Sequence, residues 1–171
     1  CFEIPERSGT LIGLLDQFLS DINIIDFQYG KTDPRRAFPV IGVEAFPDEL
    51  SKLEAKLSRS PLHFNSVTNA TSVEYRVVPF QPSLANLPIF ATVEFPDRPG
   101  ALSEFMRQIV GLTNVCYFNY TETGQSIEQA LMGFEFQDGT QRDAFTEAVA
   151  KLGVSFQTIP SNTIAGLSVT E

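Results

Sequence analysis

The chain repeats itself. Residues 2–11, FEIPERSGTL, are echoed by residues 93–102, VEFPDRPGAL, at an offset of 91 residues. The same offset aligns residues 23–29, NIIDFQY, with residues 114–120, NVCYFNY. Self-similarity over such a distance indicates two copies of one supersecondary unit. The 171 residues are enough for two small domains, each with a modest core.

Each copy has the same succession of hydrophobic periods. A short apolar strand ends at Pro5 or Pro96, because proline cannot donate to a strand ladder. An amphipathic helix, two strands, a second helix from about Asp48 or Thr140 and a last strand follow. This order predicts an α+β fold: two ferredoxin-like βαββαβ modules in tandem, with antiparallel sheets and helices on one face. The expected strands are 22–29, 38–46 and 62–67 in the first copy, and 115–120, 130–136 and 154–159 in the second.

The expected domain boundaries follow from this order. They are 1–68 for the first module, 69–87 for a connector and 88–171 for the second module. Within the connector, residues 73–78, VEYRVV, alternate like an extra strand and are followed by prolines. A sheet covered on one face leaves its other face bare, so we expect the two copies to pair edge to edge, to pack face to face, or to dimerise.

Composition excludes several classes of function. The formal net charge of −9 disfavours nucleic acid and anionic membrane surfaces as partners. No apolar run approaches the roughly 20 residues that span a bilayer. The two cysteines suit a reducing compartment, and Cys116 in its apolar stretch is expected to be a small buried residue. Because the sequence opens at Cys1, already inside a strand pattern, we expect a piece of a longer polypeptide.

Catalytic and metal-binding patterns are missing from the sequence. His63 is the only histidine and has no neighbouring nucleophile, so we expect a half-buried strand residue rather than a general base. No histidine or cysteine cluster has the spacing of metal ligands, and no glycine-rich phosphate loop is found. We therefore expect a chain without catalysis of its own.

Three pairs of positions are candidates for ligand binding. The turns that end at Gly9 and Gly100 precede helices, where free backbone amides favour an anion such as a carboxylate. A tight turn without a ligand explains them equally well. Asn23 and Asn114 follow the first helices, as helix caps or as ligand-binding amides. Tyr29 and Tyr120 share a strand face with Phe27 and Phe118, for which core packing with a solvent-wetted tyrosine ring is the alternative.

Residues 94–102, EFPDRPGAL, with Asn114 and residues 117–120, YFNY, resemble the tandem ACT-like regulatory region of biosynthetic threonine deaminase, also called threonine dehydratase or threonine ammonia-lyase. The likeness covers almost the whole chain, including the first copy. It implies an allosteric domain of isoleucine biosynthesis that binds isoleucine as an inhibitor, with valine opposing it. The implied effector-binding residues are Gly9, Thr10, Leu11, Asn23, Phe27, Tyr29, Gly100, Ala101, Leu102, Asn114, Phe118 and Tyr120.

The resemblance also implies partners and location. The partner is a separate catalytic domain that carries pyridoxal phosphate, and no cofactor or metal is expected in this chain. The protein is expected to form a homo-oligomer, without nucleic acid or membrane partners. The expected location is the cytoplasm, or the plastid in a plant.

Two features depart from the family pattern. Gly30 and Thr121 follow the strand tyrosines, where family members usually carry a basic residue. Val78-Pro-Phe80 stands where a Gly-Gly-Arg is common. Two alternatives therefore stay open, a free-standing ACT-like amino-acid-binding protein and a dimerisation module without a ligand.

Overall fold

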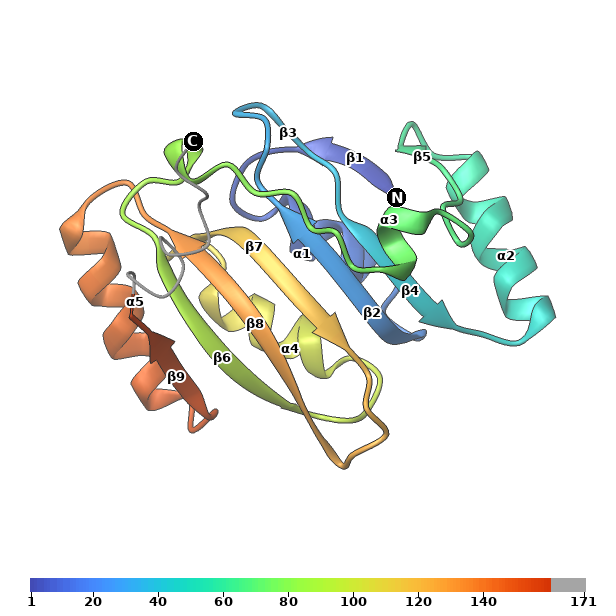
Figure 1. Cartoon of the computed structure of the whole chain (residues 1–171). Coiled ribbons are helices and arrows are strands. Elements are labelled where there is room, and N and C mark those ends of the chain that lie inside the picture. The colour runs from blue at the N-terminus through green and yellow to red at the C-terminus, as the bar shows by residue number, and fades with distance from the viewer. Residues whose placement is uncertain (161–171) are drawn as a thin grey trace.

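Antiparallel sheets with helices on one side form the structure, a computed structural model that describes residues 1–160 (Figure 1). Residues 161–171, the end of the expected second module, lie outside the described residues. The first copy contains β1 (Phe2–Pro5), α1 (Thr10–Phe18), β2 (Asn23–Gly30), β3 (Arg36–Ala37), β4 (Val40–Glu44), α2 (Pro47–Ser58) and β5 (His63–Phe64). The second contains β6 (Ile89–Pro96), α4 (Ala101–Ile109), β7 (Asn114–Thr121), β8 (Ile127–Glu135), α5 (Gly139–Lys151) and β9 (Phe156–Ile159). The predicted α+β class with antiparallel, ACT-like sheets is confirmed.

The two copies contribute strands to one sheet. Its order is β4-β2-β7-β8-β6-β9, and every pair is antiparallel. At the junction, β2 pairs with β7 so that Gln28 lies opposite Asn119, its own counterpart at the 91-residue offset. Phe27 consequently faces Tyr120, and Tyr29 faces Phe118, about a local two-fold axis. The edge-to-edge arrangement is therefore the one observed.

A smaller sheet of order β3-β1-β5 completes the first copy. Pro39 separates β3 from β4 because a proline cannot donate to the ladder. Its carbonyl still accepts a hydrogen bond of 2.9 Å from the amide of Phe2, which keeps β1 alongside. The expected strand 38–46 is thus interrupted near its start, and the last strand is reduced to His63–Phe64. His63, expected to be half-buried, is exposed.

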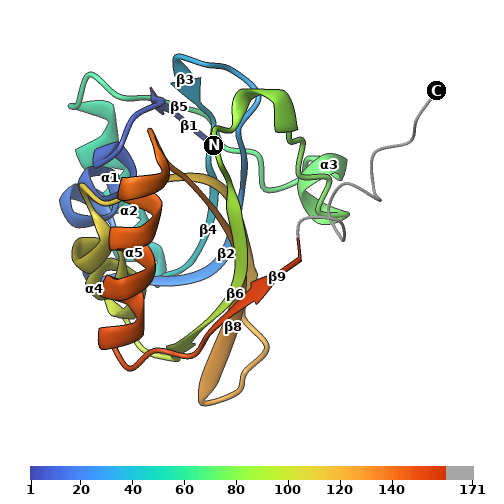
Figure 2. The same cartoon turned by 90° about the vertical axis from the view of Figure 1, so that its left-hand side faces the viewer.

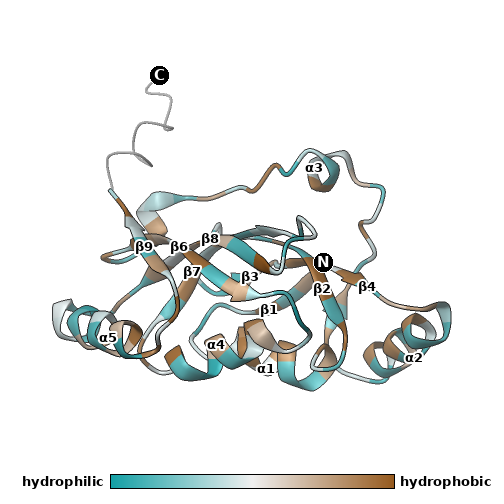
Figure 3. Ribbon diagram, turned by 90° about the horizontal axis from the view of Figure 1, so that it is seen from below, coloured by the Kyte–Doolittle hydropathy of each residue, from teal (hydrophilic) through white to brown (hydrophobic). Residues whose placement is uncertain are grey.

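Helices α1, α2, α4 and α5 cover one face of the sheets, as Figures 2 and 3 show. Their apolar sides supply core residues such as Leu15 and Phe145, both 0% exposed. Under the helices, the rings of Phe27 and Phe118 lie 4.3 Å apart between centroids, across the junction of the copies. Burial of each such side chain contributes about 1.5–3 kcal/mol. The core therefore runs without a break from one copy to the other. Cys116 is fully buried, as predicted.

The second helix of each copy begins slightly earlier than the sequence predicted. In α2, Glu49 accepts a hydrogen bond of 2.8 Å from the amide of Phe46, one turn before. In α5, Asp138 is the N-cap and accepts from the amide of Gln141 at 2.9 Å. The capping side chain, rather than Asp48 or Thr140, sets each start.

The connector crosses the sheet face that the helices leave open (Figure 3). The strand predicted at 73–78 is wrong, because the short helix α3 (Thr71–Glu74) and a turn take its place. Arg76 has a φ of 53°, which breaks an extended conformation. The 3-10 turn η1 (Pro82–Leu84) follows. In the part of the chain that the structure describes, no helix is long and apolar enough to span a lipid bilayer.

Candidate functional site

The two glycine turns adopt the same backbone conformation. Gly9 has a φ of 88° and Gly100 a φ of 84°, in the left-handed region that costs other residues about 1–2 kcal/mol. Within residues 1–160, no side chain caps the first turn of α1 or α4. The first amide of each helix, that of Thr10 or Ala101, donates to the carbonyl three residues earlier at 3.3 Å. The next two amides of each helix have no partner within the described residues and are available to an anion.

A pocket that opens to solvent lies beside Gly100. It is lined by residues of both copies, and we call it the Gly100 pocket. Six of the predicted residues meet in it, with Asn23 coming from the first copy and the others from the second. The first copy supplies Leu19, Ile22, Asn23 and Ile24, and the second supplies residues 95–103, Phe118, Tyr120 and Glu128.

A smaller pocket, also open to solvent, occupies the related position beside α1. We call it the Gly9 pocket, since it lies beside the turn that ends there. Four predicted residues line it, Thr10, Leu11, Tyr29 and Asn114, together with Ile4, Pro5, Glu6, Arg7, Ala37, Pro39 and Val115. Gly9 itself lines an adjoining depression between α1 and α4. Phe27 lines neither pocket and is fully buried.

The predicted residues therefore group across the copies rather than within them. Asn23 lines the same pocket as Tyr120, and Asn114 the same pocket as Tyr29. The sequence could not show this exchange, since it depends on the pairing of β2 with β7. Neither asparagine side chain caps the helix before it, because both amides donate to carboxylates. Asn23 Nδ2 donates to Glu44 Oε2 at 3.3 Å, and Asn114 Nδ2 donates to Glu6.

The Gly100 pocket combines an apolar wall with polar groups that can still accept or donate. Ile22, Ile24 and Phe118 supply apolar surface. Burial raises the pKa of Tyr120 to about 12, so its hydroxyl stays protonated at neutral pH and can donate. Within the described residues, this hydroxyl has no hydrogen-bond partner. The exposed carboxylate of Asp97 lies at the rim.

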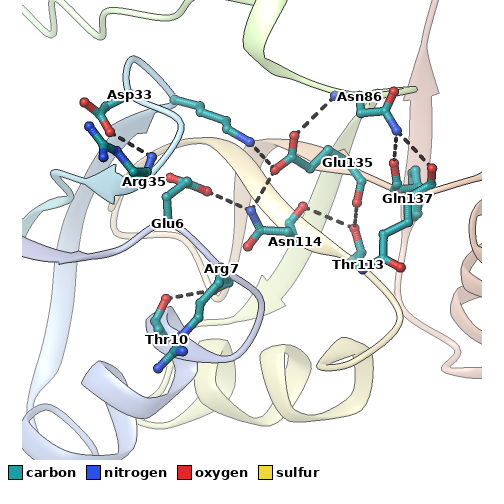
Figure 4. Close-up of polar contacts among 12 residues, drawn as sticks. Glu6, Arg7, Thr10, Asp33, Arg35, Asn86, Thr113, Asn114, Glu135 and Gln137 are labelled. Atoms are coloured by element: carbon teal, nitrogen blue, oxygen red, sulfur yellow. Dashed lines mark hydrogen bonds and ion pairs between the residues drawn. The ribbon is translucent and has the colours of Figure 1, made fainter.

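The polar groups of the Gly9 pocket, in contrast, bond to one another (Figure 4). The Glu6 carboxylate accepts from Asn114 Nδ2 at 2.7 Å and from the hydroxyl of Tyr29. Asn114 Nδ2 also donates to Glu135 Oε1 at 2.8 Å, and Lys31 Nζ donates to the same oxygen at 2.6 Å. Burial raises the pKa of Glu6 despite these two donors, and burial and the Glu6 carboxylate together raise that of Tyr29.

Sequence reasoning missed four residues of these networks. Glu6, Lys31 and Glu135 could have been found from the 91-residue offset, because they correspond to Asp97, Glu122 and Glu44 of the other copy. Arg76 has no counterpart and left no signal. Its guanidinium donates to the carboxylate of Asp26, on β2, at 2.5 Å. It also donates to two groups of β7, the side chain of Asn119 at 2.5 Å and the carbonyl of Tyr120 at 2.8 Å.

The family described as the C-terminal regulatory domain of threonine dehydratase matches residues 83–169. The matched region is half of the chain and contains every second-copy residue of the Gly100 pocket. The chain belongs to this family. The threonine dehydratase regulatory domain has an allosteric role, which we therefore assign to the chain, and the resemblance inferred from the repeat motifs is confirmed.

Full-length relatives agree with this regulatory domain. The chain is 28% identical to a threonine dehydratase of Nicotiana attenuata over 159 residues, which are 90% of the chain and 26% of the relative. It is 24% identical to a biosynthetic L-threonine dehydratase of Haemophilus influenzae, covering 91% of the chain and 31% of the relative. A chloroplastic biosynthetic threonine dehydratase of Arabidopsis thaliana is 22% identical, covering 90% and 26%. The chain thus spans about a quarter to a third of the relatives' length.

Proposed function

We propose that this regulatory domain binds isoleucine in the Gly100 pocket and thereby restrains a separate threonine dehydratase catalytic domain, with valine as the opposing ligand. One observation carries the proposal. The pocket sets the uncapped start of α4, the free hydroxyl of Tyr120 and the amide of Asn23 against a branched apolar wall. A small zwitterion with an aliphatic side chain needs these three kinds of surface.

The carboxylate and side chain of the effector have separate partners in this proposal. The carboxylate accepts hydrogen bonds from Tyr120, Asn23 and the first-turn amides of α4, where the helix dipole also favours a negative charge. The branched side chain packs on Ile22, Ile24 and Phe118. Because charged groups must be paired when they leave water, the ammonium lies toward the carboxylate of Asp97 at the rim.

Arg76 supplies a route from the pocket to the rest of the protein. It holds the connector against both β2 and β7, and its bond to the Tyr120 carbonyl reaches a residue that lines the pocket. A ligand that binds Tyr120 differently in two states shifts the balance between them. We propose that the connector transmits this shift to the catalytic domain.

Pyridoxal phosphate belongs to the partner domain in this proposal. The cofactor is held by a lysine as a Schiff base. In this chain Lys31 is 9% exposed, and its ammonium is bonded to Glu135 at 2.6 Å, so it is engaged in a buried ion pair. The residues around it do not fit the cofactor.

Titration calorimetry and thermal melting test the proposal. A ligand at 100 times its Kd stabilises the folded state by about 2.7 kcal/mol, which raises the melting temperature by several degrees. Isoleucine and valine should give heat and a melting shift, while leucine, aspartate and lysine should do less. If none of these amino acids gives either signal at millimolar concentration, the effector role is wrong and a structural role remains.

A further inference from the structure

We infer that the hydrogen-bond donors of the Gly9 pocket are already engaged by the chain's own Glu6 carboxylate, so that the chain has one effector site, the Gly100 pocket. This inference rests on the proposed function, because it concerns the same class of ligand. It treats Glu6 as an internal substitute for the effector's carboxylate.

The two pockets can be compared residue by residue. Glu6 corresponds to Asp97, Tyr29 to Tyr120, and Asn114 to Asn23. The backbone at the first pair is also the same: Glu6 donates its amide hydrogen to Arg35 O at 2.9 Å, and Asp97 donates to Ser126 O at 3.0 Å, again at the 91-residue offset. The side chains of Glu6 and Asp97 therefore start from equivalent backbone positions.

The side chains differ in where the acid lies. The carboxylate of Glu6 turns inward and takes the hydrogens of both Tyr29 and Asn114. Asp97 is one methylene shorter and stays exposed. In the described part of the chain, its side chain bonds to neither Tyr120 nor Asn23. Within the described residues, the Tyr120 hydroxyl is free for a ligand and Asn23 Nδ2 has one carboxylate partner, Glu44. Their counterparts are more fully engaged, because Tyr29 donates to Glu6 and Asn114 Nδ2 donates to both Glu6 and Glu135.

Displacement of Glu6 is unfavourable for two reasons. A carboxylate tethered next to its donors competes at an effective concentration of millimolar or more. The ammonium of Lys31, the cation that acts on Glu6, is paired with Glu135 at 2.6 Å. Arg7 also lines the pocket, but within the described residues its guanidinium bonds to neither carboxylate. An incoming amino acid would place a third carboxylate beside those of Glu6 and Glu135, while the ammonium of Lys31 is already engaged. Lys31 has Glu122 as its counterpart, so the charge pattern of the two pockets also differs.

The experiment exchanges the acids of the two copies and counts isoleucine sites by calorimetry. The unchanged protein should bind one isoleucine per chain. Glu6→Asp copies the second repeat and should open a second site, whereas Asp97→Glu copies the first and should weaken the existing site at least tenfold. Glu3→Ala removes a neighbouring surface carboxylate that lines neither pocket and should leave one site.

A second measurement decides the inference even if no amino acid binds. Glu6→Ala removes a group of atoms that matches one acetate ion. Acetate should therefore raise the melting temperature of this variant, relative to chloride at equal ionic strength. It should not raise the melting temperature of Glu3→Ala. Two sites in the unchanged protein would overturn the inference. So would the absence of both a new site in Glu6→Asp and an acetate shift in Glu6→Ala. Acetate rescue in a protein that binds no amino acid supports the role of Glu6 and refutes only the effector proposal.

Discussion

Glu6 and Asn114 are 108 residues apart in the sequence, yet a hydrogen bond of 2.7 Å joins their side chains across the boundary between the copies. Asn114 also reaches Glu135, and through it the ammonium of Lys31. Side chains of both copies thus form one hydrogen-bonded network across their boundary.

The two tyrosines should respond differently to loss of the hydroxyl. Tyr120→Phe removes a donor to the effector carboxylate, and a hydrogen bond to a charged group contributes about 1.5–3 kcal/mol. We expect isoleucine affinity to fall roughly 10- to 100-fold with little change in unfolding free energy. Tyr29→Phe should leave the affinity unchanged and lower stability by about 1–3 kcal/mol, since Glu6 loses a partner. Calorimetry and urea unfolding separate the two effects, and equal losses of affinity would contradict the assignment.

Glu6 should make stability depend on pH. Its pKa is raised in the folded protein above the ordinary 4.5, chiefly by burial. A raised pKa means that the stabilising contribution is complete below the unfolded-state pKa and is lost as pH rises through the folded-state pKa. The unchanged protein should therefore lose stability relative to Glu6→Gln as pH rises from about 4 upward. Urea unfolding of both proteins across this range measures the difference, and a constant difference would refute the prediction.

Lys31 and Glu135 form a buried pair, with side chains 11% and 10% exposed. Lys31→Met should lower the unfolding free energy by about 3–5 kcal/mol, because it leaves the Glu135 carboxylate buried and uncompensated. Adding Glu135→Gln should recover part of this loss, since the amide keeps an acceptor for the backbone of Asn86. Chemical unfolding of the single and double variants tests this, and additive losses would argue against a direct pair.

Arg76→Leu should loosen the connector. The substitution removes bonds to Asp26, Asn119 and the Tyr120 carbonyl in a partly exposed site. We expect a loss of about 1–3 kcal/mol in stability and faster amide hydrogen exchange in residues 71–80. Asp26→Asn should show a smaller loss, and the double variant should lose less than the sum. Unchanged exchange in the connector would show that Arg76 does not hold it.

The sequence predicted most of the fold because hydrophobic periods and the repeat agree with each other. The helices around Leu15 and Phe145 and the strands of Phe27 and Phe118 lie where the periods placed them. The prediction of a strand at 73–78 was wrong because this segment has no strand to pair with. The positive φ of Arg76 also could not be predicted from the residue types around it.

The candidate site could be predicted as a set of residues but not as an arrangement. Gly100 and Tyr120 were found from local motifs, whereas their partner Asn23 comes from the other copy. Such pairing depends on which sheet edges meet, and a single sequence does not encode this choice in any local pattern. The role of Glu6 was hidden for a different reason. The Glu6 side chain is one methylene longer than that of Asp97. Only the three-dimensional structure shows that its carboxylate accepts hydrogen bonds from Tyr29 and Asn114.

The junction at which Gln28 faces Asn119 has the symmetry of an isologous homodimer contained in a single polypeptide. In a true homodimer every substitution appears twice, so both pockets change together. Covalent fusion of the halves removes this coupling, and each half can then diverge alone. Glu6 against Asp97 and Lys31 against Glu122 are such divergences. Divergence of this kind converts an ancestor with two equal binding sites into a protein in which one half binds the effector and the other half only stabilises the fold.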